Sequence, residues 1–136
     1  MTNPEKQQHT YVQKIGNRGE QTALQFLLDK GYEECAKNYH SGYGEIDLIV
    51  KNSECIVFVE VKTRNNRSPS RPAEAVTLHK QQCIIKTAVH YLTEYPTELQ
   101  PRFDVVEVIY SKVKHCVTEV SHIENAFYQN EEYAVF

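Results

Sequence analysis

Two apolar segments in the middle of the chain carry charged residues where a buried strand normally has none. Residues 44–50 read GEIDLIV, and residues 56–64 read IVFVEVKTR. Both segments are rich in the β-branched and aromatic residues that favour strands. Because burying a carboxylate or an ammonium group is unfavourable unless the charge is paired, these charges require an explanation beyond folding.

The spacing of the charges predicts where they meet. Side chains alternate between the two faces of a strand, so Glu60 and Lys62 share one face, and Glu45 and Asp47 share a face of the preceding strand. If residues 51–55 form a hairpin turn, the two strands pair antiparallel and bring acids of neighbouring strands close together. The sequence therefore predicts that Asp47 and Glu60 converge.

Convergent carboxylates are typical of a metal site, because two like charges stay ionised at close range only when a cation lies between them. Oxygen ligands of this kind favour Mg²⁺ or Mn²⁺. Lys62 would then orient an attacking water molecule or neutralise charge on a phosphoryl group. The alternative is structural: Glu60 and Lys62 form a surface ion pair on a solvated sheet face, and Asp47 caps a turn.

Two known sequence patterns are similar to this arrangement. Asp47 followed by Glu60-Val61-Lys62 resembles the PD-(D/E)xK motif of restriction-endonuclease-like and Holliday-junction-resolvase-like nucleases. From about residue 16 to 127 the chain also resembles the YraN-like family of small, largely uncharacterised bacterial proteins. The residues that carry this resemblance are Gly19-Glu20, Ala23, Phe26-Leu27, Gly31-Tyr32, Asn38, 44–49, 57–64, Glu74-Ala75-Val76, Lys80, Ala88, Tyr91-Leu92, 102–106 and 125–127.

The resemblance implies an α/β fold in which helices flank a central mixed sheet, with a restriction-endonuclease-like αβββαβ core. It implies a nuclease that uses Mg²⁺ or Mn²⁺ to hydrolyse phosphodiester bonds in DNA, including branched or repair intermediates. In resolvase-like relatives an acid from the first helix joins the metal site, and this role corresponds to Glu20 here. Glu45 is a candidate additional acid. The alternative for Glu20 is a surface position near a helix start, where the dipole favours an acid.

Hydrophobic spacing predicts the remaining elements. Residues 11–30 and 73–91 have the three-and-four spacing of helices, and Gly31 is placed to end the first. Glu20 falls on the apolar stripe of the first helix, so we expect it to face the sheet. Residues 33–39, 103–109 and 113–123 are predicted strands, in which Asp104 and Glu107 are interpreted as strand-edge charges.

The basic residues are concentrated after the second acidic segment, although the net charge of the chain is −3. Phosphate binding depends on such cations. We predict nucleic-acid contacts from five residues: Arg64, Arg67, Arg71, Lys80 and Gln81. The alternative is a solvated loop, residues 65–72, followed by a solvated helix face. The same loop is either a substrate-gripping flap or a plain connector.

Length and composition predict one domain at residues 11–127, a disordered N-terminus at 1–10 and a tail at 128–136. No apolar stretch approaches a membrane span and no secretory signal is recognisable, so we expect a cytoplasmic protein that does not bind a membrane. The four cysteines lack metal-ligand spacing and are predicted to be reduced, mostly buried thiols. Glycine-rich nucleotide-binding motifs and a GxSxG turn are missing from the sequence.

Three classes of function follow from these patterns. The first is a Mg²⁺-dependent nuclease that acts on DNA. The second is a nucleic-acid-binding module that has the nuclease fold without turnover, and the third is a protein-interaction adaptor that uses a sheet edge or a tyrosine-rich surface. Cutting both strands of a duplex generally needs two sites, so we also expect a homodimer.

Overall fold

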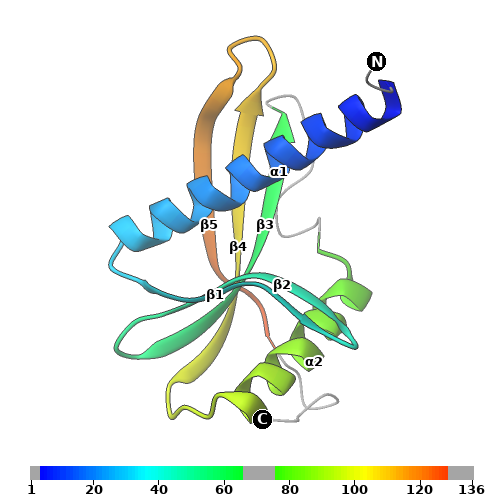
Figure 1. Ribbon diagram of the computed structural model, residues 1–136. Helices are drawn as coiled ribbons and strands as arrows, with labels where there is room; N and C mark the ends of the chain where they lie inside the picture. Colours follow the sequence, from blue (N-terminus) through cyan, green and yellow to red (C-terminus); the bar gives the residue numbers. More distant parts are fainter. Residues whose placement is uncertain (1–3, 66–75, 129–136) are drawn as a thin grey trace.

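Helices cover both faces of a five-stranded mixed sheet in the computed structural model, which describes residues 4–65 and 76–128 (Figure 1). The predicted α/β class, a mixed sheet flanked by helices, is confirmed. None of the helices in these described ranges is long and apolar enough to cross a lipid bilayer. The elements are α1 (Pro4–Asp29), β1 (Glu33–Ser41), β2 (Gly44–Lys51), β3 (Cys55–Asn65), α2 (Leu78–Glu94), β4 (Gln100–Ser111) and β5 (Cys116–Phe127).

The strands follow one another in the sheet in the order β1-β2-β3-β4-β5. Neighbours pair antiparallel, as the predicted hairpin between β2 and β3 requires, except that β3 and β4 run parallel. Parallel neighbours need a crossover connection, and α2 lies in the segment that joins β3 to β4. The topology therefore places α2 beside the second acidic strand.

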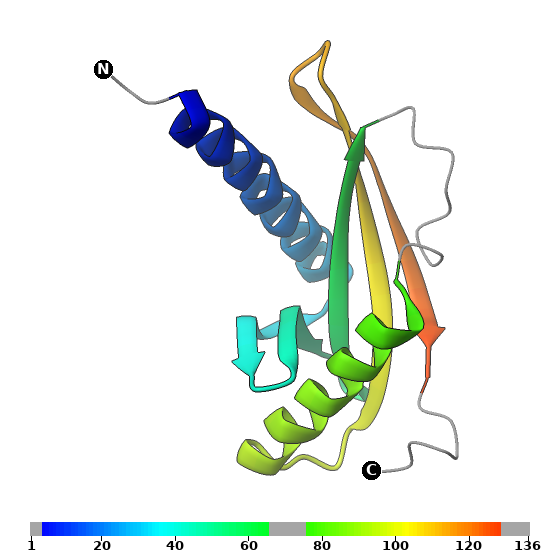
Figure 2. The same ribbon diagram turned by 90° about the vertical axis from the view of Figure 1, so that its right-hand side faces the viewer.

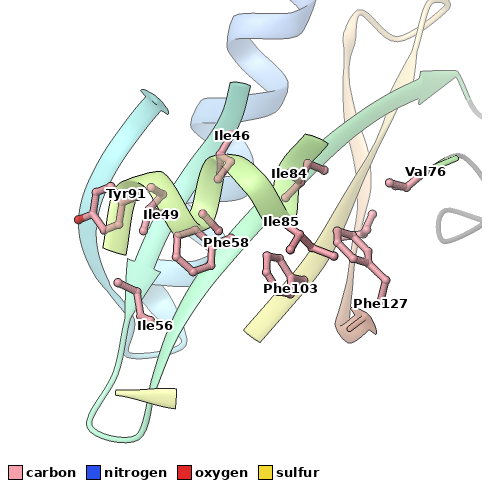
Figure 3. Close-up of a cluster of buried hydrophobic side chains, with 12 residues drawn as sticks. Ile46, Ile49, Ile56, Phe58, Val76, Ile84, Ile85, Tyr91, Phe103 and Phe127 are labelled. Carbon is pink, nitrogen blue, oxygen red and sulfur yellow. The ribbon is translucent and has the colours of Figure 1, made fainter. Parts of the chain in front are cut away.

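Alternating apolar side chains on β3 build two separate cores. Phe58 and Ile56 pack with α2, whereas Val57 and Val59 pack with Ala23, Leu24 and Leu27 of α1. Figure 3 shows the first core, in which Phe58, Phe103 and Phe127 come from three strands beneath α2. Their rings stack in succession, with centroids 5.6 and 5.2 Å apart. The two helices thus pack on opposite faces of β3.

The sheet divides between β2 and β3. The ladder that joins them contains four residue pairs and ends at Leu48 opposite Val59. Beyond that pair, β2 continues with β1 as far as Gly44, and β3 continues with β4 as far as Asn65. Figure 1 shows the β1–β2 pair running crosswise to β3, β4 and β5. We call this division the fork, and it lies directly beside Asp47 and Glu60.

The helix ends differ from the sequence-based predictions. α1 begins at Pro4, inside the segment predicted to be disordered, and ends as predicted before Gly31, whose φ of 99° suits glycine. α2 begins at Leu78, later than the predicted residue 73, because the Thr77 side chain accepts a hydrogen bond from the Lys80 N–H and caps the helix. Predicted helical residues 73–75 lie outside the described residues, as do residues 129–136 of the predicted tail.

The interpretation of Asp104 and Glu107 as strand-edge charges is wrong. β5 covers β4 on its far side, so β4 is an inner strand and both acids are buried. Asp104 accepts hydrogen bonds from the Arg102 guanidinium, from His122 Nε2 at 2.7 Å and from the Asn125 N–H at 3.0 Å. The acid is therefore fully paired inside the protein, as burial of a charge requires.

The cysteines form no disulfide: Cys35, Cys55, Cys83 and Cys116 are all free thiols, as predicted. Their predicted burial is not confirmed. The first three are partly exposed and Cys116 is exposed. Cys35 packs against the first core and Cys55 against the second.

Gly19 allows α1 to approach the sheet closely. A Cβ atom at this position would lie 2.1 Å from Thr63 Oγ1 and 3.3 Å from Thr63 Cβ on β3. A larger side chain at this position requires the Thr63 side chain to rotate or the helix and strand to move apart. Gly19 therefore allows the short distance between α1 and β3. This distance positions Glu20, which is the next residue of the helix.

We predict that Gly19→Ala lowers the free energy of unfolding by about 1–3 kcal/mol, because the added methyl overpacks the helix–sheet contact. Combining it with Thr63→Ala, which removes the nearest atom, should restore most of the loss. Chemical denaturation of both variants and of Thr63→Ala measures this coupling. Gly42→Ala is the matched control, since a Cβ there meets nothing within 4 Å. Equal stability of Gly19→Ala and Gly42→Ala would contradict the role assigned to Gly19.

Candidate metal centre

Asp47 lies where β2 leaves β3. Its Oδ2 accepts a hydrogen bond from the Val61 N–H at 2.8 Å, in place of a backbone ladder bond. Continuing the antiparallel register from Leu48 opposite Val59 puts Asp47 opposite Glu60. The side chain thus holds the two branches of the sheet together at the fork.

Glu60 is buried, with 5% of its surface exposed, and two ammonium groups approach it. Lys62 Nζ lies 3.4 Å and Lys80 Nζ 3.6 Å from Glu60 Oε1. Lys62 comes from the same face of β3, as the alternation predicts, and Lys80 comes from the first turn of α2. The buried carboxylate is consequently bonded from the strand and from the helix layer.

Asn38 connects the two remaining acids to the fork. With its side-chain amide oriented to satisfy both carboxylates, its nitrogen donates to Glu45 Oε1 at 3.0 Å and to Glu20 Oε2 at 3.2 Å. The backbone of Asn38 has a φ of 48°, a left-handed conformation that asparagine tolerates better than most residues. His40 Nε2 also lies 3.7 Å from Glu45 Oε1. Four carboxylates from α1, β2 and β3 therefore surround the fork.

The electrostatics of the site show an excess of negative charge. Burial, followed by the charge of Glu60, raises the pKa of Asp47 to about 7, although the Val61 N–H opposes the change and Glu20 and Glu45 add to it. Burial also raises the pKa of Glu20, against the hydrogen bond from Asn38. The four acids outnumber the ammonium groups of Lys62 and Lys80, so a cation bound among them would favour their ionised forms.

The acids of the site offer carboxylate oxygens, the donors that small, hard cations prefer. Within residues 4–65 and 76–128, no three His, Cys, Asp or Glu side chains are arranged so that they could hold one metal ion. A zinc site normally needs three or four such protein ligands. Mg²⁺ is usually bound through one or two carboxylates, with waters and substrate phosphates completing the shell. Asp47 and Glu60 can serve as those two carboxylates.

The five residues predicted to contact nucleic acid do not share one surface in the described structure. Arg64 is 11% exposed and forms an ion pair with the buried Glu107, 3.5 Å from Nε to Oε1, so it lies inside the protein rather than on an open surface. Lys80 is at the acid cluster. Gln81 Nε2 donates to the Val76 carbonyl at 2.9 Å. Arg67 and Arg71, and most of loop 65–72, lie outside the described residues.

The sequence reasoning did not assign Asn38 a role, although its amide bridges two of the acids. Asparagine is unfavourable inside a strand but common at left-handed backbone positions. Its presence in a predicted strand is therefore the one local signal that Asn38 has a special role. The signal was insufficient because the contact with Glu20 joins β1 to α1. Such a contact depends on tertiary packing.

Comparison with known proteins identifies relatives of this chain. The sequence model of the uncharacterised protein family UPF0102 matches residues 19–108. A UPF0102 protein of Caldanaerobacter subterraneus subsp. tengcongensis is 46% identical over 114 residues, covering 83% of this chain and 93% of its own. One of Acinetobacter baumannii strain AYE is 48% identical over 97 residues, covering 70% and 73%, and one of Chlorobium phaeobacteroides strain BS1 is 41% identical over 117 residues, covering 83% and 93%.

We predict that Asp47→Asn reduces the loss of stability between pH 4 and pH 8. The pKa of Asp47 is higher in the folded protein, about 7, than its ordinary value of 3.8. Its contribution to stability is therefore complete below pH 3.8 and is lost as the pH rises through 7. Asparagine has no such proton to lose and can still accept the Val61 hydrogen bond. Between pH 4 and pH 8 in EDTA, the stability of the variant relative to wild type should increase by about 4 kcal/mol.

Urea denaturation at several pH values measures this difference. Asp29→Asn, at the exposed C-terminal end of α1, is the matched control and should follow the wild-type curve. Parallel stability curves for Asp47→Asn and wild type over the whole pH range would show that folding does not raise the pKa of Asp47.

Proposed function

Because this chain belongs to the uncharacterised protein family UPF0102, whose description assigns no reaction, we propose from the site itself that the protein is a nuclease that uses Mg²⁺ or Mn²⁺ to hydrolyse phosphodiester bonds in DNA. The observation that carries the proposal is the meeting of four carboxylates and two ammonium groups at the fork. A site with this charge distribution is suited to a divalent cation and a phosphate.

The residues divide into three roles in this proposal. Asp47 and Glu60 bind the cation, and Glu20 and Glu45 add negative charge around it. When bound, the cation supplies polarisation of the phosphoryl group and lowers the pKa of water. Lys62, 30% exposed, orients the water or neutralises charge that develops on the phosphoryl oxygens.

The sequence order of these groups supports the nuclease assignment. Asp47 precedes Glu60-Val61-Lys62, as in the PD-(D/E)xK motif, and the elements from α1 to β4 occur in the order αβββαβ expected for a restriction-endonuclease-like core. By this likeness the substrate is DNA, including branched or repair intermediates. A homodimer would present two such sites to two strands.

We predict metal-dependent cleavage of DNA. Labelled linear, flapped and four-way DNA should be cut in Mg²⁺ or Mn²⁺ and left intact in EDTA. Glu60→Gln and Lys62→Met should each lower the rate by roughly 100-fold or more, because each removes a charged group next to the reacting phosphate. Lys114→Met, in the exposed β4–β5 turn, controls for loss of a lysine. Undiminished cutting by purified, folded Lys62→Met would reject the assignment.

A second candidate is a nucleic-acid-binding module without turnover, and one observation favours it. Glu60 already has two lysine partners, and no three-residue ligand group exists in the described part of the chain. These lysines would then neutralise the acid in place of a metal. Calorimetric titration of wild type and Asp47→Ala with Mg²⁺ or Mn²⁺ separates the two functions. Salt-sensitive DNA binding without metal uptake or cleavage would support the second.

A further inference from the structure

A polar cavity adjoins the acid cluster on the α1 side of the fork. It has a volume of about 400 Å³ and lies between α1 and the β1–β2 pair, which are on the same side of β3 in Figure 2. Glu20 and Asn38 belong to its lining, so the cavity shares two residues with the candidate metal centre. A group held there therefore lies beside Glu20 and beside Asn38, which donates to Glu45.

The wall of the cavity combines two cations with several amides. Arg18 of α1 and Lys37 of β1 are exposed and line the cavity together with Asn17 and Gln21. No ion pair joins Arg18 to another residue in the described ranges. Among the described residues, Lys37 pairs with Glu34 at 3.7 Å, and this exposed pair is weak enough to exchange for another anion. Both cations are therefore available to a phosphate.

The floor of the cavity is apolar. It is formed by the buried side chains of Leu24 and Leu48. Guanidinium and ammonium groups bind phosphate oxygens, carboxamides hydrogen-bond to base edges, and an apolar surface packs against a base. These are the groups that one nucleotide would contact.

The size of the cavity restricts the form of the nucleic acid. About 400 Å³ is within the range of pockets that enclose a small ligand. A duplex, whose major groove alone is about 12 Å wide, cannot enter it. A nucleotide reaches such a pocket only when it is unpaired and out of its stack.

We propose that this cavity receives one unpaired nucleotide beside the scissile phosphate, with Arg18 and Lys37 contacting its phosphate group. The inference rests on the proposed nuclease function and specifies its substrate class as DNA with an unpaired strand at the site of cutting. The amides of Asn17 and Gln21 contact the sugar or the base. The site therefore requires an unpaired segment, as in a flap or a junction arm.

Steady-state cleavage of a flapped DNA and of a fully paired duplex with the same sequence tests the proposal. We expect wild type to prefer the flap. Arg18→Gln/Lys37→Gln should raise KM for the flap roughly tenfold with little change in kcat, because it removes binding contacts outside the reacting centre. The salt dependence of single-strand binding should become shallower by about 0.7, which corresponds to the one phosphate group that both cations contact.

Two further variants make the test specific. Lys112→Gln/Lys114→Gln removes the same charge from the exposed β4–β5 turn and should behave as wild type. Gln21→Trp changes no charge but fills the cavity from an exposed helix position, and it should also raise KM for the flap. Its effect distinguishes occupation of the cavity from long-range attraction.

The outcomes separate this inference from the function on which it rests. If wild type neither binds nor cuts any DNA with Mg²⁺ or Mn²⁺, the proposed function and the inference both fail. If wild type cuts but Arg18→Gln/Lys37→Gln matches the Lys112→Gln/Lys114→Gln control, only the inference is overturned. Equal or better cutting of the paired duplex would likewise overturn the requirement for an unpaired nucleotide.

Discussion

The early end of the β2–β3 ladder is the constraint on which the rest of the site depends. If pairing continued past Leu48 and Val59, Asp47 and Glu60 would lie side by side on an unbroken sheet face. Instead the branches separate, and the Asp47 carboxylate accepts the Val61 N–H that the ladder would have used. The opening admits Glu20 and Asn38 from one side and Lys80 of α2 from the other.

Two buried or partly buried aspartates in this protein show how hydrogen-bond donors determine the state of an acid. Burial tends to raise the pKa of Asp104, but hydrogen bonds from His122, Arg102 and the Asn125 N–H lower it. Burial raises the pKa of Asp47 to about 7, three acidic neighbours add to the rise, and a single backbone donor opposes it. Asp104 stabilises the fold as a paired charge. A cation bound beside Asp47 would favour the ionised form of that acid.

Local sequence was sufficient for the parts of the site that lie within one hairpin. The alternation in residues 56–64 correctly placed Glu60 and Lys62 on one face, and the turn at 51–55 gave antiparallel pairing with Asp47 near Glu60. It was insufficient for Arg64, which pairs with the buried Glu107 across a parallel ladder. Parallel neighbours are far apart in sequence, so a local pattern does not reveal which strand covers a charge.

The sequence by itself determined the class of fold, the two acidic strands and the family to which the chain belongs, because periodicity and motif spacing are local properties of the chain. Tertiary structure decided that the sheet divides beside Asp47, that Asn38 joins acids of β2 and α1, and that a polar cavity adjoins them. These features depend on the close approach of α1 at Gly19 and on the twist between sheet branches. Only long-range packing fixes such distances.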